Sequence, residues 1–172
     1  MKQIRTHLTH GLIAAIVLGI ATGVVFAASV HFKNSQPVTA TNNGSALTLT
    51  VCAGLSGLGN GDVTIRLTAV AAPTAVCINP SGNQEPPGQN PAQVSVSGAT
   101  IIPSDQIKNG NVSFCVETSA PPQPTAAEAH CHSSAGWTAR ITHMTFCNYT
   151  ITVEQGGNIV LGPQTFGFEN CP

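Results

Sequence analysis

The stretch "TITVEQGGNIVL", residues 150–161, decides the fold. Its first half alternates isoleucine and valine with polar residues, and this period of two is typical of a β-strand with one buried face. Two glycines and an asparagine follow at positions 156–158, and these residue types tolerate the positive φ angles of a tight turn. A second apolar run comes directly after them. The stretch therefore predicts a β-hairpin.

The same period of two recurs along the chain, with threonine or serine at many of the alternate positions. Such runs are typical of strands whose outer face meets solvent. The longest run, residues 137–153, is too long for one flat strand, and its apolar positions change parity. We therefore predict a bulge or a break near His143. The other runs are "SALTLTV" (45–51), "DVTIRLTAV" (62–70), "AQVSVSG" (92–98) and "GNVSFCVET" (110–118).

Loops rich in Gly, Pro, Asn and Ser separate the runs, and only one of them contains a helical turn pattern, from Thr125 to Ala129. Seven or eight short strands with such loops predict an all-β fold. We expect an antiparallel β-sandwich of immunoglobulin-like or other Greek-key topology, with a β-barrel as the alternative. The predicted sandwich domain spans residues 45–172. Residues 29–44 form an N-terminal segment, in which the polar stretch 34–44 is either a short linker or an N-terminal strand.

Residues 1–28 have the layout of a secretory signal peptide. Lys2 and Arg5 precede an uncharged run that ends in small residues, and cleavage fits after Ala27 or after Ser29. The alternative is an uncleaved membrane anchor, because the run is nearly as long as a membrane-spanning helix. We expect a secreted, extracellular or cell-surface protein, which contacts a membrane only if the leader is retained.

The exported part of the chain is poor in charge. It keeps four of the six Lys and Arg residues and all seven Asp and Glu residues, a formal charge of −3. Binding to nucleic acid needs a basic stripe, which four scattered cations cannot form. Nucleic acid is therefore excluded as an expected partner.

All six cysteines lie in the exported part, and an even number there predicts disulfides. No two of them have the Cys-x-x-Cys spacing of a zinc knuckle or a redox centre. Six cysteines can pair in 15 ways, and the residues alone do not choose among them. The cysteines are Cys52, Cys77, Cys115, Cys131, Cys147 and Cys171.

Five motifs spread over the exported part carry a family resemblance: "HFKNS" (31–35), "GLGNGDVT" (57–64), "CINPSGNQEPPGQNP" (77–91), "KNGNVSF" (108–114) and "GWTARITHMTF" (136–146). Together they resemble a family of small secreted bacterial β-sandwich proteins without a characterised function. The resemblance implies secretion and a single β domain, and it lends no activity. It also implies a disulfide between Cys77 and Cys131. The pairing of the other four cysteines stays open.

The hexapeptide "AHCHSS" (129–134) raises the question of a metal site. In an extended segment His130 and His132 would lie on one face, where two imidazoles can share a copper or zinc ion. A third ligand would have to come from His143 or His31, because a disulfide-bonded Cys131 offers no thiolate. The alternative is a disulfide-anchored loop that carries two exposed histidines.

Catalytic patterns are absent from the sequence. The glycine-rich "GLSGLGNGD" (54–62) leads into a strand and not into the helix that a phosphate-binding loop requires. No serine lies in a Gly-x-Ser-x-Gly motif, and the few acidic residues do not cluster. We expect neither an enzyme nor a bound cofactor.

These features predict a secreted or cell-surface β-sandwich with a binding, adhesive or structural role toward an extracellular protein or glycan. The loops 54–62 and 79–90 are the predicted contact surfaces, since function in sandwiches concentrates in loops. Trp137 is expected to begin a strand and pack into the core. Two alternatives are an exported copper- or zinc-binding protein that uses His130 and His132, and an inhibitor of an extracellular enzyme.

Overall fold

The computed structural model describes residues 29–84, 91–132, 135–169 and 171; the predicted signal peptide, residues 1–28, lies outside them. Almost all of the regular structure is β. Within the described ranges, no helix is long and apolar enough to cross a membrane. The elements are β1 (His31–Phe32), β2 (Thr39–Asn43), η1 (Gly44–Ala46), β3 (Thr48–Ser56), β4 (Val63–Ile78), β5 (Val94–Ile102), η2 (Ser104–Gln106), β6 (Val112–Glu117), β7 (Thr138–Gln155) and β8 (Asn158–Gly167).

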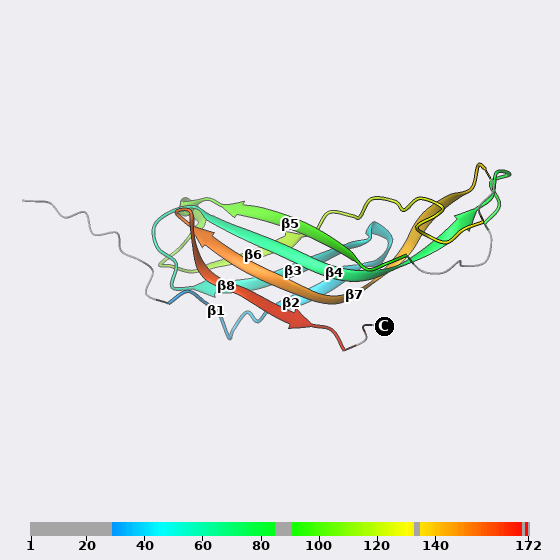
Figure 1. Cartoon of the computed structure of the whole chain (residues 1–172). Helices are drawn as coiled ribbons and strands as arrows, with labels where there is room; N and C mark the ends of the chain where they lie inside the picture. The colour runs from blue at the N-terminus through cyan, green and yellow to red at the C-terminus, as the bar shows by residue number, and fades with distance from the viewer. Residues whose placement is uncertain (1–28, 85–90, 133–134, 170, 172) are drawn as a thin grey trace, which may run out of the picture.

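Two antiparallel sheets form the molecule (Figure 1). In the first sheet β3 pairs with β6 on one side and with both β1 and β2 on the other. The second sheet has the order β5-β4-β7-β8. The predicted antiparallel β-sandwich is confirmed, including its disulfide bracing. β1 and β2, from the N-terminal segment, belong to the first sheet, so the stretch 34–44 contains a strand, which was one of the two alternatives.

The core lies between the sheets and follows from the period of two. In the central part of β3 and the first half of β4, large aliphatic side chains at alternate positions are fully buried, while most residues between them are half-buried or exposed. The buried ones are Leu49, Val51, Leu55, Val63, Ile65 and Leu67. Burying each large aliphatic side chain stabilises the fold by about 1.5–3 kcal/mol, so this alternation favours one face of each strand. Tyr149 of β7 also reaches the core and stacks on Phe166 of β8 at a centroid distance of 5.1 Å.

The hairpin predicted from residues 150–161 is confirmed. Gln155 and Asn158 are register partners, so Gly156 and Gly157 alone form the turn, with φ angles of 59° and 79°. Two central residues with positive φ are the requirement of the tightest hairpin turns. The bulge predicted near His143 is also confirmed, because β7 has one extra residue there, Thr142. A second bulge in β7, at Cys147, was not predicted.

The hairpin also orders the loop between β3 and β4. The side-chain amide of Gln155 donates hydrogen bonds to the carbonyl oxygens of Gly59 and Gly61, at 2.9 and 2.8 Å. Its oxygen accepts the N–H of Gly59 at 2.9 Å. One half-buried side chain therefore satisfies three backbone groups of a loop that has no regular structure of its own.

We expect Gln155→Ala to lower the free energy of unfolding by about 1–2 kcal/mol, because three backbone groups lose their partner. Gln155→Glu is the informative comparison. It keeps an acceptor for the Gly59 N–H but sets a carboxylate against two carbonyl oxygens, so it should be no more stable than the alanine variant. Urea unfolding of both variants checks this, and an unchanged midpoint for either one would remove Gln155 from this role.

Candidate binding site

A two-stranded ribbon extends beyond the four-stranded part of the second sheet. β5 pairs with β4 only as far as Ala71, and β8 pairs with β7 only from Asn148 onward. Past these points β4 and β7 continue as a pair, 72–78 against 138–145, and project from one end of the sandwich (Figure 1). The segment 119–132 runs along this ribbon. We call the ribbon and this segment together the arm.

A disulfide and buried contacts hold the arm together, which it needs because an isolated two-stranded ribbon is marginally stable in water. Cys77, near the end of β4, is bonded to Cys131 of the segment, the pair implied by the family resemblance. The side-chain oxygen of Gln123 accepts the backbone N–H of Ile141 at 2.7 Å. Ala129 and Ile141 are buried, so the segment covers the ribbon with apolar contacts as well.

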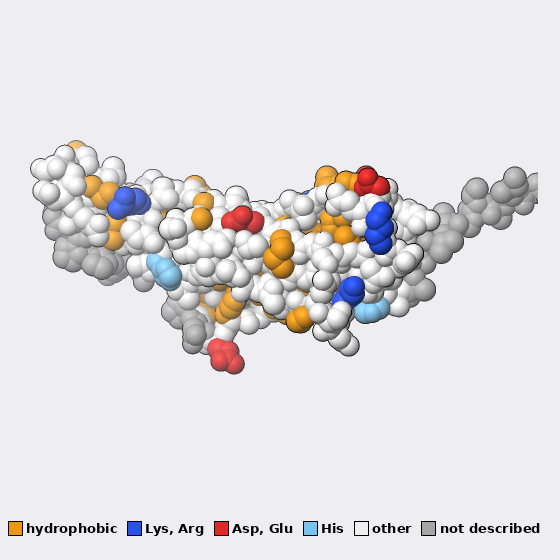
Figure 2. Space-filling model, turned by 180° about the vertical axis from the view of Figure 1, so that it is seen from behind, with side chains coloured by type: hydrophobic (Ala, Val, Ile, Leu, Met, Phe, Trp, Pro, Cys, Tyr) orange, Lys and Arg blue, Asp and Glu red, His pale blue; other side chains and the backbone are white. Residues whose placement is uncertain are grey.

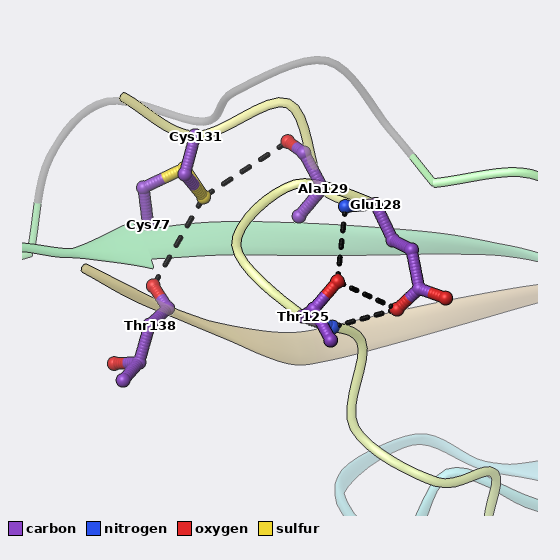
Figure 3. Close-up of a disulfide and its surroundings, with 6 residues drawn as sticks. All are labelled: Cys77, Thr125, Glu128, Ala129, Cys131 and Thr138. Atoms are coloured by element: carbon purple, nitrogen blue, oxygen red, sulfur yellow. Dashed lines mark hydrogen bonds between the residues drawn. A yellow bond between two sulfur atoms is a disulfide. The ribbon is translucent and has the colours of Figure 1, made fainter. Parts of the chain in front are cut away.

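A capping box orders the turn that carries Cys131 (Figure 3). The Glu128 carboxylate accepts the N–H of Thr125 at 2.8 Å and its hydroxyl at 2.9 Å, and the Thr125 hydroxyl oxygen accepts the N–H of Glu128 at 3.2 Å. This reciprocal pattern defines the start of a helical turn. The N–H of Cys131 closes the turn on the carbonyl of Ala126 at 2.8 Å. The turn thereby presents the Cys131 sulfur to β4.

The capping box should respond to pH. The backbone N–H of Thr125, and then its hydroxyl, lower the pKa of Glu128 below its ordinary value. Because this pKa is lower in the folded state, the stabilisation is present at neutral pH and is lost as the pH falls through the folded value. We expect the amide NMR resonance of Thr125 to move with the ionisation of Glu128. Glu128→Gln should abolish that movement, and a Thr125 resonance that ignores the titration would contradict the assignment.

The histidines predicted as metal ligands are not brought together. His130 has a φ angle of 50° and belongs to the turn, so the segment is not extended and the expected one-face arrangement with His132 is wrong. His143 is exposed on β7. His31 lies at the other end of the molecule, where its Nδ1–H donates to the carbonyl oxygen of Ser29 at 2.9 Å. Among the residues that the structure describes, no three His, Cys, Asp or Glu side chains lie close enough to hold a metal ion.

Trp137 does not pack into the core, so that expectation is wrong. It is half-buried at the start of β7, where the ribbon has passed beyond the opposing sheet and no core is available. Its indole stacks on the imidazole of His132, with ring centroids 5.6 Å apart and planes 28° from parallel. The stacked pair places an aromatic surface near the tip of the arm.

A groove of about 200 Å³ lies between the arm segment and the base of the ribbon. Prolines dominate its lining, and a proline ring loses little conformational entropy when a partner covers it. Ile141 and Gln123 also line the groove, and Glu128 is the one carboxylate among the lining residues. Figure 2 shows how few charged side chains the molecule presents on one face. The prolines are Pro73, Pro91, Pro122 and Pro124.

The two loops predicted as contact surfaces lie at opposite ends of the molecule. β4 joins them, and its 16 residues span roughly 50 Å at the rise of an extended strand. The loop 57–62 is bonded to Gln155 within the sandwich end. The loop after β4 extends the arm, and Asn79 orders it by accepting the N–H groups of Ser81 and Asn83 at 3.0 and 2.9 Å. Residues 85–90 of that predicted loop lie outside the described residues.

No protein-family model matches the chain, and a search of curated proteins finds no significant match. The geometry therefore defines the class by itself: a disulfide-braced β-sandwich with a covalently fixed arm. The sequence signals that were not recognised are Pro122 and Pro124 in the segment 119–124 and Pro73 within a strand-like run, all of which line the groove.

Proposed function

We propose that this protein is a secreted, non-catalytic β-sandwich that binds an extracellular protein through its arm. The observation that carries the proposal is the arm itself, an ordered projection that lies largely outside the main core and is fixed by Cys77–Cys131. A fixed surface loses little entropy on association, which is the general advantage of preorganisation. The residues of such a projection add little to the buried core of the sandwich.

Export is supported by the predicted leader and by the cysteines. Three disulfides are the pattern of proteins that fold in an oxidising compartment. Secretion or attachment to the cell surface is therefore part of the proposal.

A non-catalytic role is supported by the use of the acidic side chains. Asp62 accepts the N–H of Ser104, Glu117 accepts hydrogen bonds from Asn43 and Thr48, and Glu154 pairs with Arg66. Each of these carboxylates is engaged in holding strands or loops in place. None of these three carboxylates lines the groove between the arm segment and the base of the ribbon.

An immunoglobulin-like topology is the assignment we favour within the sandwich class. With β3, β4, β6, β7 and β8 taken as strands B, C, E, F and G, the order β2-β3-β6 corresponds to A-B-E and β5-β4-β7-β8 to C′-C-F-G. Domains of that class commonly present binding surfaces at the ends of the sandwich. The arm occupies such an end.

A protein partner fits the arm better than a glycan. Sugar recognition would need an open aromatic face with hydrogen-bonding side chains around it, whereas one face of Trp137 is already covered by His132. The neighbouring groove offers proline rings and aliphatic groups, and these are the apolar surfaces that protein interfaces use. An inhibitor of an extracellular enzyme would be one such binding protein.

Site-directed photo-crosslinking tests the proposal. A photo-crosslinking amino acid is placed at Arg140 on the arm in one sample and at Lys108, an exposed cation at the opposite end, in another. Both samples are irradiated in the extracellular fluid of the producing cells. We expect a discrete protein adduct from position 140 only. Adducts from position 108 alone, or binding on a glycan array that leaves position 140 without a protein adduct, would overturn the proposal.

A further inference from the structure

The exposed disulfide on the first sheet has the features of a reactive site. We propose that Cys52–Cys115 exchanges with low-molecular-weight thiols in the folded protein, with Cys115 as the sulfur that is attacked. This site is separate from the arm and does not depend on the function proposed for it. Three features support the exchange: the register of β3 and β6, the exposure of the two cysteines and the groove beside them.

The two cysteines are direct register partners on neighbouring antiparallel strands, with Cα atoms 4.1 Å apart. Val51 and Ala53, on either side of Cys52, point into the core and are buried, so the disulfide lies on the outer face of the sheet. Cys52 is half-buried and Cys115 is exposed. By contrast, in the arm disulfide Cys77 is buried and Cys131 is half-buried, so neither of its cysteines is exposed.

An open groove of about 440 Å³ adjoins the disulfide and gives a small thiol room to approach. Its polar lining includes the hydroxyls of Thr39 and Ser113 and the side chain of Gln36, which accepts the Ser113 hydroxyl hydrogen bond at 2.7 Å. These groups can hydrogen-bond the peptide-like parts of a thiol such as glutathione. Pro37 and the two cysteines also line the groove.

The sheet order favours attack at Cys115. Thiol–disulfide exchange proceeds by a thiolate that approaches one sulfur in line with the sulfur–sulfur bond. The bond spans from β3 to β6, and β6 is an edge strand of its sheet, so the approach to Cys115 comes over that edge. The in-line approach to Cys52 comes from the other side of β3, where β2 continues the sheet and Thr39, which also lines the groove, is its register partner. Cys52 is also half-buried, whereas Cys115 is exposed. Cys52 is therefore the leaving group.

The chemistry is balanced by two thiols. The first thiolate forms a bond to the Cys115 sulfur, the Cys52–Cys115 bond breaks, and Cys52 leaves with the electron pair as a thiolate. A second thiolate attacks the thiol-derived sulfur of this mixed disulfide and releases Cys115 as a thiolate. Overall two low-molecular-weight thiols are oxidised to their disulfide, and the protein disulfide is reduced to two thiols.

The fold should tolerate this exchange. β3 and β6 are paired at six positions by backbone register, so the two strands remain neighbours when the disulfide opens. The other two disulfides instead fix segments with little pairing of their own, the arm segment at Cys131 and the chain end at Cys171. Opening Cys52–Cys115 therefore exposes two thiols on an intact sheet.

The test exposes the folded, oxidised protein to reduced glutathione, quenches it by alkylation and maps the products by mass spectrometry. We expect a glutathione adduct on Cys115 with Cys52 alkylated, formed at least about tenfold faster than any product at Cys77 or Cys131. Far-ultraviolet circular dichroism should not change during the reaction. An adduct on Cys52, equal rates at Cys52–Cys115 and Cys77–Cys131, or reaction only after denaturant is added would each overturn the proposal.

A double variant, Cys52→Ser with Cys115→Ser, supplies the control. It should keep the β-sheet spectrum and form no glutathione adduct on the first sheet. Loss of the β-sheet spectrum in this variant would show that the fold does not tolerate the opening of Cys52–Cys115. The wild-type measurement remains decisive in that case, because it identifies the attacked sulfur without any substitution.

Discussion

Replacing Cys77 and Cys131 together with serine is expected to open the arm while the sandwich stays folded. The disulfide closes a loop of 54 residues, and losing such a cross-link costs about 2–4 kcal/mol. Among the described residues no further strand pairs with the ribbon beyond Ala71, so most of this loss should appear there. The pairing of β3 with β6 and the buried core between the two sheets do not involve Cys131.

Hydrogen exchange with mass spectrometry measures this loss directly. Peptides that cover the ribbon, including the Ile141 amide bonded to Gln123, should lose protection in the double variant, while peptides from β3 should keep it. The matched control replaces Cys147 and Cys171 with serine, which frees the chain end and leaves the arm bonded. Equal loss of protection in the arm and in β3 would show that the arm is not a separate unit.

Gly98→Ala should be the most damaging single substitution outside the buried side chains. A Cβ at Gly98 would overlap the carbonyl oxygen of Glu117 and lie 2.7 Å from its carbonyl carbon. This close approach lets the N–H of Ser119 reach the carbonyl of Ser97 at 2.9 Å and so ties the two sheets together at one edge. Because both atoms belong to backbone, neither can rotate away. We expect a loss of about 3 kcal/mol.

Thermal unfolding measures this effect, and a loss of that size should lower the melting temperature by roughly 10 °C. Gly167→Ala in β8 is the matched control, because a Cβ there would have no atom within 4 Å. It should leave the melting temperature within about 2 °C of the wild-type value. Equal melting temperatures for the two variants would mean that the sheets do not approach each other at Gly98 as described.

The strands themselves could be predicted because their signal is local. A side chain on one face of a strand repeats every second residue, so threonine alternating with valine or leucine marks both the strand and its buried face. The bulge near His143 was predictable for the same reason, since one extra residue shifts the parity of every apolar position after it. The turn at Gly156 and Gly157 needed only the conformational freedom of glycine.

The arm could not be predicted because its limits are set by other strands. The alternation of buried and less buried residues in β4 runs from Val63 to Ala75 and is not interrupted at Ala71, where β5 stops. The one local signal is Pro73, which has no N–H to donate to a further strand. The burial of Trp137 was wrongly predicted for the same reason, because a residue at the start of a strand is buried in the core only where another sheet faces it.

Tertiary structure also determines which cysteines pair and whether the histidines come together. Cys52 and Cys115 become partners only when β3 and β6 are aligned, and no local pattern contains that alignment. For His130 and His132, the expected geometry assumed an extended segment, and the capping box of Thr125 and Glu128 bends the chain into a turn instead.

The affinity of the crosslinked partner for variants of the protein tests the role of the arm most directly. The partner is purified, and its dissociation constant is measured for the wild type, for Trp137→Ala on the arm and for Ile159→Ser, an exposed apolar residue in the hairpin at the opposite end. We predict at least about a tenfold weaker affinity for Trp137→Ala, the loss typical of an aromatic interface residue, and an unchanged affinity for Ile159→Ser. Wild-type affinity in Trp137→Ala together with weakened binding in Ile159→Ser would contradict binding through the arm.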